Sequence, residues 1–377
     1  MNPIHKIVAA VPAPLRAKVR ALLDAPARRS ALEKFSNIAL ADAASPVIGL
    51  GGTLDHGGLI HGGAVKLLSL RDAFVCDERA FNLLYLVSSA QPAFADDLVR
   101  ICRARGIKFV WNQNGVGYPA WAGREAERHN APMRRLRAQA DHVVYQSAFC
   151  RESAEMFLGP CAKSSTILLN PVDLQKYSPR PDALAPAPLR LLAMGTQNYR
   201  ERFVSVLECL RELRGDGLDC SLTVAGPLIW PGAERDAREM AAAFGVADRV
   251  EPRPPFRQDE APDIYRAHHI LLHPKYMDPC PTVVAEALAC GLPVVASRSG
   301  GIPEMVDTGC AELIDVPVSW DTLHTPSGRR LAQVVQEIIP RLGQYSRSAR
   351  RRAEEAFDAR RWQEHHAEIF RAVLSAS

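Results

Sequence analysis

The sequence lacks the features that mark several large classes of protein. Its nine cysteines are an odd number, with no CxxC pair and no Cys/His cluster at metal-ligand spacing, which excludes a disulfide framework and a zinc module. No apolar stretch approaches the ~18 residues that a spanning helix needs, and the first residues do not have the pattern of a signal peptide. We therefore expect a cytoplasmic protein whose thiols are reduced.

Charge of one sign is also scarce. The chain has 46 lysines and arginines against 42 aspartates and glutamates, which leaves a formal net charge of +4 on 377 residues, and it contains no long run of like charges. A dedicated nucleic-acid-binding protein is therefore not expected. The hydrophobic fraction of 47% is enough for a full core in each of about two domains.

The order of apolar runs divides the chain into four parts. Residues 1–45 are expected to be a helical extension, because apolar residues between Leu15 and Leu23 recur at helical spacing among basic ones. Short β-rich runs then alternate with helices, and a Pro-rich stretch at 178–188 interrupts this alternation before it resumes. The predicted parts are the extension 1–45, an N-terminal domain 46–180, a C-terminal domain 189–345, and a C-terminal helix 346–377 that packs back toward the N-terminal domain.

The alternation of strands and helices predicts a parallel sheet with crossover helices in each half. The expected fold class is α/β, with two Rossmann-like doubly wound domains that face a central cleft, where such folds bind their ligands. The predicted strands are 47–50, 83–88, 108–111, 142–145 and 166–169 in the first half, and 189–194, 222–225, 269–273, 293–296 and 312–316 in the second.

The most informative segment is LLHPKYMDPCPTVVAEALACGLPVVASRSGGIPE, residues 271–304. A strand that ends near His273 is followed by a loop that carries Asp278 and by a helix whose first turn begins at Pro281. The helix ends where Gly291 and Pro293 stop it. The strand, loop and helix therefore place the start of a helix at the carboxyl edge of the sheet.

This helix start has the chemistry of an anion site. The free backbone amides around Thr282 and Val283 favour a phosphate or diphosphate. Glu286 lies one and a half turns further along, among apolar neighbours, and its two acceptor oxygens suit a vicinal diol such as that of a ribose. The alternative is that Glu286 pairs with an arginine and that Asp278 is an ordinary loop residue.

These residues resemble the C-terminal domain of family 4 glycosyltransferases, which have the GT-B fold. The loop acid, the helix glutamate eight residues later and the following EALACGLPVVASRSGGIPE are similar to the Glu-x7-Glu motif of that family. The resemblance implies that Glu286 holds the ribose of the donor and that Asp278 reaches hydroxyls of the donor sugar. Further segments agree in order and spacing, ADHVVYQSAF at 140–149, ILLNPVDLQKYSP at 167–179 and LRLLAMG at 189–195, so that the resemblance covers roughly residues 46–375.

The sequence departs from the family pattern at three positions. Asp278 stands where the family normally has the longer glutamate. Gly195 is followed by Thr196 where an arginine is frequent, and Arg202 takes the place of a lysine six residues later. Arg202 can still hold a phosphate, with Arg200 as a substitute for the missing charge, although Arg202 could equally be a solvated charge at a helix start. The predicted donor-binding residues of the C-terminal half are Gly195, Thr196, Cys280, Pro281, Thr282, Val283 and Glu286, and those of the N-terminal half are Gly62, Gly63 and Asn112.

The N-terminal half contributes a glycine turn. Neither a GxGxxG fingerprint nor a GK[ST] phosphate loop is present. Gly62 and Gly63, at the start of a helix, are similar to the GG turn of the family, where a ligand can approach the backbone. A plain flexible loop is the alternative for this glycine-rich stretch.

The strand at 108–111 ends in NQNGVG, without the histidine that many relatives of the family have near this point. Asn112 and Asn114 are the candidates to replace it with neutral hydrogen bonds, although Asn114 and Gly115 could simply form a turn. His56 and His61 could also take over this position.

The resemblance implies a reaction. It predicts transfer of a sugar from a UDP- or GDP-linked donor to a hydroxyl of a glycan, lipid-linked or small-molecule acceptor, with retention of configuration. Asp278, Arg202 and Asn114 are the predicted catalytic residues, and no metal or cofactor besides the donor is expected, since no DxD-type motif stands in a suitable loop. The alternatives are a sugar-nucleotide-binding protein that has lost turnover, and another GT-B enzyme such as an epimerase or a phosphorylase.

Two basic segments bear on membrane contact. The helix around residues 16–23 and the cluster of Arg134, Arg135 and Arg137 could rest on anionic lipid at the inner face of the membrane. The alternative is that both helices pack on the first domain and keep their charges in water.

Overall fold

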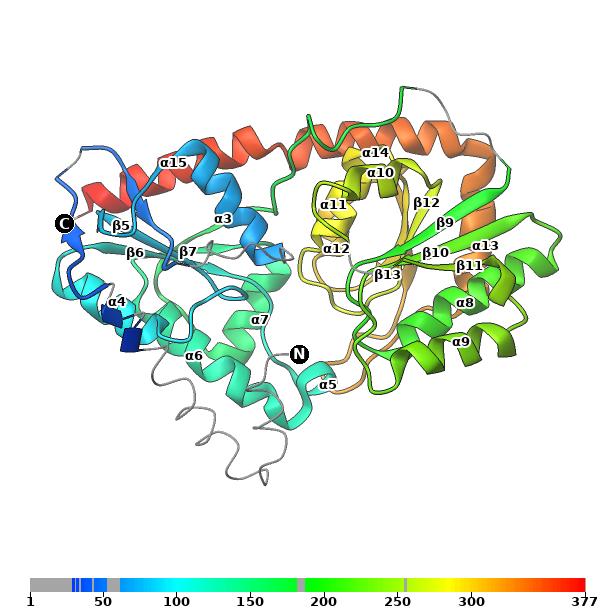
Figure 1. Ribbon diagram of the computed structural model, residues 1–377, viewed down its shortest axis with the longest axis horizontal. Coiled ribbons are helices and arrows are strands. Elements are labelled where there is room, and N and C mark those ends of the chain that lie inside the picture. Colours follow the sequence, from blue (N-terminus) through cyan, green and yellow to red (C-terminus); the bar gives the residue numbers. More distant parts are fainter. Residues whose placement is uncertain are drawn as a thin grey trace.

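The computed structural model describes residues 29–30, 32–33, 35–42, 44–52, 62–181, 187–253 and 256–376. The basic helix expected between Leu15 and Leu23, and the loop histidines His56 and His61, lie outside these residues. Figure 1 shows two α/β units beside each other, the N-terminal one in blue to cyan and the C-terminal one in green to yellow. Among the described residues, no helix is both long enough and apolar enough to cross a membrane.

The N-terminal domain is built on a six-stranded sheet with the order β3-β2-β5-β6-β7-β8, in which every strand pair is parallel. Its central strands are buried on both faces, as the continuous apolar run LLYLV in β5 predicts. The strands are β2 (Val47–Gly49), β3 (Val75–Cys76), β5 (Leu83–Val87), β6 (Lys108–Gln113), β7 (His142–Tyr145) and β8 (Ser164–Ile167), beside a small pair of β1 (Ala39–Leu40) and β4 (Ala80–Phe81). The helices are α3 (Gly62–Ala73), α4 (Ala95–Ala104), α5 (Pro119–Ala122), η1 (Gly123–Glu125), α6 (Ala126–Gln139) and α7 (Ala148–Leu158).

The C-terminal domain has a second parallel six-stranded sheet, with the order β11-β10-β9-β12-β13-β14. The strand order reverses between β9 and β12, so a crevice opens at their carboxyl ends. The strands are β9 (Leu189–Met194), β10 (Cys220–Ala225), β11 (Val250–Arg253), β12 (Ile270–His273), β13 (Val294–Arg298) and β14 (Ala311–Asp315). The helices are α8 (Arg200–Gly215), α9 (Ala233–Ala243), η2 (Ala247–Arg249), α10 (Ala261–Arg266), α11 (Thr282–Ala289), α12 (Ile302–Met305), α13 (Gly328–Ile338) and η3 (Ile339–Arg341).

This architecture confirms the predicted fold class of two Rossmann-like domains that face each other. The edge strands β3 and β11 were not predicted. Their residues are mostly exposed or half-buried, and β11 contains Pro252, so neither has the apolar run that marks a central strand.

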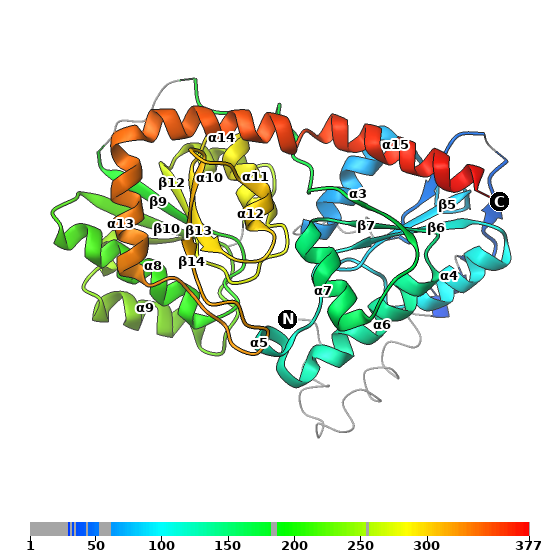
Figure 2. The ribbon, with the colours of Figure 1, turned by 180° about the vertical axis from the view of Figure 1, so that it is seen from behind.

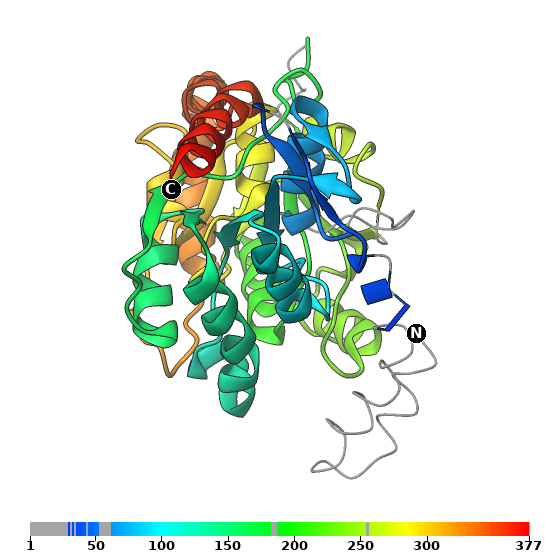
Figure 3. The same cartoon turned by 90° about the vertical axis from the view of Figure 1, so that its left-hand side faces the viewer.

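The chain ends in two helices where one was predicted. α14 (Leu342–Ala356) packs on the C-terminal domain, and α15 (Ala359–Ser375) lies on the N-terminal domain. In Figures 1 and 2 both run along one side of the molecule, and Figure 3 shows α15 in red from the end where the C-terminus lies. The break falls at Phe357, which is buried, and at Asp358, whose side chain accepts from the amide of Arg360 and caps α15. The interruption lets the chain cross from one domain to the other.

The two domains also touch directly on the opposite side. Trp320, in the loop between β14 and α13, stacks on Phe149 of the N-terminal domain with ring centroids 5.6 Å apart and meets Tyr118 edge-on. The Glu304 carboxylate of α12 accepts from the backbone amides of Ala148 and Phe149, at 2.6 and 2.8 Å. A carboxylate of one domain therefore satisfies the free amides at the start of α7 in the other.

A buried histidine joins α15 to the N-terminal sheet. His366 is fully buried, and its Nδ1 lies 2.9 Å from the carbonyl of Trp362 while its Nε2 lies 3.0 Å from the hydroxyl of Tyr85. The Trp362 carbonyl can only accept, so Nδ1 carries the proton and Nε2 accepts from Tyr85. Burial lowers the pKa of His366 to about 3.

The buried histidine generates a prediction about stability. Below about pH 6.5 the unfolded chain binds a proton at His366 that the folded chain does not. Stability is complete above this pH and falls as the pH drops toward 3, by about 1.4 kcal/mol per pH unit from this group. The substitution His366→Gln removes the titration and flattens the slope. Urea unfolding between pH 7 and pH 4.5 measures it, with the exposed neighbour His365→Gln as the control, and equal slopes in the three proteins would contradict the assignment.

Candidate active site

A cavity of about 560 Å³ lies between the two domains, at the carboxyl ends of both sheets. Figure 2 shows α11 and α12 on the side of the C-terminal domain that faces α3 and α7. The C-terminal wall comes from the loops after β9 and β12 and from α11, and the N-terminal wall comes from α3 and the loops after β5, β6 and β7. Every residue of the predicted site except Gly62 and Asn112 lines this cavity, which sequence reasoning placed at a central cleft.

The first turn of α11 opens onto the cavity. Pro281 is extended (φ −67°, ψ 116°) and precedes the helix without a side-chain cap. The amides of Thr282 and Val283 have no hydrogen-bond partner among the described residues. Gly195, at φ +91°, brings the loop after β9 against Val283, because a Cβ there would touch the valine at 3.4 Å. The free amides are therefore available for an anion in the cleft.

Glu286 is 5% exposed and lies behind these amides. Its Oε1 accepts from Nε2 of Gln258 and its Oε2 from the hydroxyl of Tyr265, both at 2.8 Å. Burial raises the pKa of Glu286 above its usual value, against the hydrogen bonds from Tyr265 and Gln258 that favour the carboxylate. No arginine or lysine in the described part of the chain forms an ion pair with Glu286. The alternative of an internal arginine partner therefore finds no support here.

Asp278 lies deeper in the loop and is held by two neighbours. Its Oδ2 is 2.8 Å from Nζ of Lys275 and 3.3 Å from Nε2 of His273. Burial opposes ionisation of Asp278, but Lys275 and His273 hold its pKa well below the ordinary value. The SGG of the motif follows from this packing, because a Cβ on Gly300 would lie 2.4 Å from the carbonyl oxygen of Asp278. Asp278 is therefore a fixed carboxylate beside a cation.

Arg202 is hydrogen-bonded to the backbone of the loop after β9. Its guanidinium donates to the carbonyls of Thr196 and Met194, at 3.1 and 3.2 Å, and approaches Nδ1 of His273 at 3.4 Å. The side chain is 2% exposed, so it is not the solvated charge that the alternative described. Arg200, the expected substitute for the missing arginine, is exposed and does not line the cavity. Lys275, which pairs with Asp278, lines the cavity as a further cation of the C-terminal wall.

The N-terminal wall differs from the prediction in two residues, because neither Gly62 nor Asn112 lines the cavity. Asn114 lines the cavity, whereas Asn112 is 1% exposed and lies behind Lys66, which accounts for its absence from the lining. Gly63 lines the cavity as well, and its Cβ would lie 2.4 Å from Oγ of Ser89. A side chain at position 63 would therefore have to displace Ser89, so Gly63 lets α3 lie close to the turn after β5, a packing role that the sequence analysis did not consider.

The polar residues of the site that sequence reasoning missed include Lys66, Gln258, Tyr265 and Lys275. The signal for Lys275 was present, since it directly follows the HP that ends a strand. The signal for Lys66 was its position three residues after the glycine pair. Gln258 and Tyr265 had none, because their contact with Glu286 joins residues 28 and 21 positions apart.

The expected basic cluster on α6 does not form a free cationic face. Arg134 pairs with Glu127, Arg135 pairs with Asp96, and Arg137 is buried and donates to a backbone carbonyl. The alternative in which this helix packs on the first domain therefore holds for the described part of the chain.

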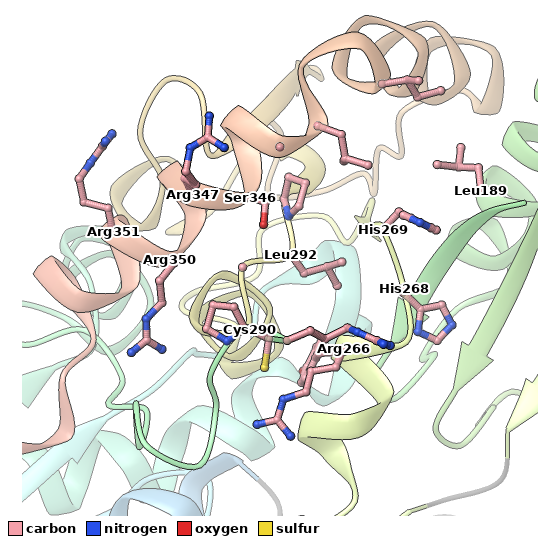
Figure 4. A pocket seen from close by; sticks show the side chains of 18 of the residues that line it. Leu189, Arg266, His268, His269, Cys290, Leu292, Ser346, Arg347, Arg350 and Arg351 are labelled. Carbon is pink, nitrogen blue, oxygen red and sulfur yellow. The ribbon is translucent and has the colours of Figure 1, made fainter. Parts of the chain in front are cut away.

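A second cavity, of about 670 Å³, lies between α10, α14 and the turn after α11 (Figure 4). Arginines border it, but Arg350 donates to the carbonyl of Ala289 and pairs with Glu354, and Arg266 donates to the carbonyl of Ser178. None of the predicted site residues lines it. No group of three metal-binding side chains is found within the described ranges.

Comparison with known proteins agrees with this geometry. The family described as glycosyl transferases group 1 matches residues 188–323, which contain the loop after β9, Asp278 and α11. The chain is 29% identical to the GDP-mannose-dependent alpha-(1-6)-phosphatidylinositol monomannoside mannosyltransferase of Mycolicibacterium smegmatis over 275 residues, 68% of each chain. It is 23% identical to the phosphatidylinositol N-acetylglucosaminyltransferase gpi3 subunit of Schizosaccharomyces pombe over 211 residues, 56% of this chain and 45% of that protein.

The chain thus aligns with less than half the length of the first curated relatives that it matches. Among solved structures, HepE of Anabaena in complex with UDP is similar with a TM-score of 0.62 at 17% identity, covering 82% of each chain. This likeness concerns the fold. Residues 188–323 therefore match the glycosyl transferases group 1 family, and the two domains together have the GT-B fold.

Proposed function

We propose that this protein transfers a sugar from a nucleoside diphosphate sugar to an acceptor hydroxyl, with retention of configuration. The observation that carries the proposal is Glu286, a buried carboxylate with only neutral partners behind the free amides of α11. The amides suit the diphosphate, and the carboxylate suits the two hydroxyls of a ribose. Both lie in the cleft between the domains.

The donor is proposed to be a UDP- or GDP-linked hexose. The mycobacterial relative is named as GDP-mannose-dependent, and the HepE structure is described as a complex with UDP, so both bases belong in the first screen. The proposed acceptor is a glycan, a lipid-linked molecule or a small molecule. Two relatives carry phosphatidylinositol in their names, which supports including lipid-linked acceptors and peripheral membrane contact in that screen.

The leaving diphosphate is proposed to be stabilised by the protein's own charges. The amides of Thr282 and Val283 carry the positive end of α11, and Lys275 adds a cation beside Asp278. Arg202 holds the carbonyls of the loop after β9 and adds positive charge beneath it. This arrangement supports a reaction that proceeds without a metal ion or a further cofactor. Asp278, held between Lys275 and His273, orients the sugar and does not attack it.

The acceptor hydroxyl is proposed to attack from the face that the diphosphate leaves. A diphosphate oxygen then takes the proton of the attacking hydroxyl, the bond from C1 to the leaving oxygen breaks, and the new bond forms on the same face. The product therefore keeps the anomeric configuration of the donor. Proton NMR of the product from UDP-glucose or GDP-mannose, with EDTA present, tests both statements. An inverted product, or a loss of activity in EDTA, would contradict them.

The first mutational prediction for the cleft concerns nucleotide binding. The substitution Glu286→Gln replaces a charged acceptor by a neutral one at the ribose, and a hydrogen bond to a charged group contributes about 1.5–3 kcal/mol. We expect the Kd for UDP or GDP to rise roughly 10- to 100-fold. Isothermal titration calorimetry measures the change. Glu239→Gln, on the exposed face of α9, is the control that should bind as the wild type does, and equal affinities in all three proteins would be inconsistent with the role of Glu286.

The second prediction concerns turnover. The substitution Lys275→Met removes a cation from the cleft and leaves Asp278 with His273 alone. Loss of one group that stabilises developing charge lowers kcat by about 10²-fold. Steady-state kinetics with the preferred donor measure this, with the exposed Lys163→Met as the control. A kcat within twofold of the wild type would exclude Lys275 from the reaction.

A further inference from the structure

Lys66 is a buried cation on the N-terminal wall of the cleft. It is 2% exposed, and its Nζ donates to Oδ1 of Asn112 at 2.9 Å, Oδ1 of Asn114 at 2.7 Å and Oε1 of Gln146 at 2.9 Å. No carboxylate among the described residues forms an ion pair with it. Three neutral amides therefore satisfy the three donors of the ammonium group.

The three amide oxygens converge on one point, and only a donor of three hydrogen bonds can hold them there. Without the ammonium group, three partial negative charges would face each other across a few ångströms, and the Asn114 and Gln146 amides would turn. The turn of the Asn114 amide would alter the cleft itself. Nδ2 of Asn114 donates to Oγ of Ser89, and both side chains line the cavity. Lys66 thus determines which end of the Asn114 amide faces the reactants.

The far side of this network is rigid. Nδ2 of Asn112 donates to the hydroxyl of Tyr85 at 2.9 Å, and that hydroxyl donates to Nε2 of His366. The direction of each bond follows from the tautomer of His366, so the Asn112 amide cannot turn without losing two partners. Asn112 therefore holds Lys66 from behind while Asn114 meets the cleft in front.

We propose that Lys66 is a positioning residue for sugar transfer, whose ammonium group orients the Asn114 amide toward the donor sugar and the acceptor. This inference rests on the proposed function. It assigns to the N-terminal domain a task separate from nucleotide binding, because the groups proposed for the ribose and the diphosphate lie on the C-terminal wall. Loss of Lys66 should affect turnover and leave nucleotide affinity unchanged.

The charge state of Lys66 provides a specific readout. Burial lowers the pKa of Lys66 to about 8, so the ammonium group is present below this pH and is lost above it. The titratable groups around Lys66 do not change their charge near pH 8, so they do not obscure its titration. The pKa values of the Cys150 and Cys280 thiols are raised by burial to about 11 and about 12, that of Tyr85 is raised further, and that of His366 is lowered to about 3.

The experiment compares the wild type with Lys66→Met, Gln146→Glu and the exposed control Lys163→Met. UDP and GDP are the probes for binding, and UDP-glucose and GDP-mannose are the donors for turnover. We expect Lys66→Met to lower kcat by about 10²-fold, because misplaced groups cost this much, with a nucleotide Kd within twofold of the wild type. We expect Lys163→Met to match the wild type in both.

The pH profile distinguishes positioning from a merely structural role. The wild type should lose activity as the pH rises through about 8. Gln146→Glu places a carboxylate beside the ammonium group and should move this limb upward by about one pH unit, since a nearby opposite charge favours the charged form. Thermal unfolding of each variant reports whether it is folded. The shift in Gln146→Glu remains measurable even if Lys66→Met does not fold.

The outcomes separate the two proposals. A folded Lys66→Met with wild-type kcat, or an alkaline limb that Gln146→Glu does not move, overturns the role of Lys66 while the proposed function stands. A wild type that binds UDP or GDP but consumes neither donor overturns the proposed function, and the role of Lys66 with it.

Discussion

The site depends on one constraint, the placement of an ionisable carboxylate inside an apolar helix. Val284, Ala287 and Leu288 surround Glu286 on α11 and are fully buried. Such a carboxylate needs hydrogen-bond donors, and Tyr265 and Gln258 supply them without a neutralising cation. The anionic group therefore stays available to a ligand at the point where the strand order of the sheet reverses.

Three contacts hold the two walls of the cleft against each other. The crossing from α14 to α15 ties the end of the chain to the N-terminal sheet, Glu304 caps α7 from the other domain, and Trp320 packs between Tyr118 and Phe149. Because these contacts lie on both sides of the cleft, they fix how its two walls face each other around a cavity of about 560 Å³. Reaction in such a cleft depends on the relative position of both domains.

Much of the fold and half of the site could be predicted from residues close together in sequence. Buried parallel strands have continuous apolar runs, and the spacing of Asp278 and Glu286 belongs to one loop and one helix. The sequence did not reveal that Asn112 lies behind Lys66, and it left open whether the Arg134, Arg135 and Arg137 cluster rests on lipid or packs on the first domain, where its charges are paired or buried. Both points depend on the partner of a polar side chain, and such partners come from distant elements.

The amino-acid sequence by itself determined the two α/β domains, the start of α11 at the carboxyl edge of the sheet and the carboxylate behind it, because each follows from apolar periodicity, proline and glycine positions and local spacing. Only the tertiary structure decided which polar groups meet. It placed Lys275 against Asp278, Tyr265 and Gln258 against Glu286, and Lys66 among three amides. The physical reason is that hydrogen bonds act over about 3 Å, and no local pattern specifies which distant side chains the packing of two sheets brings within that distance.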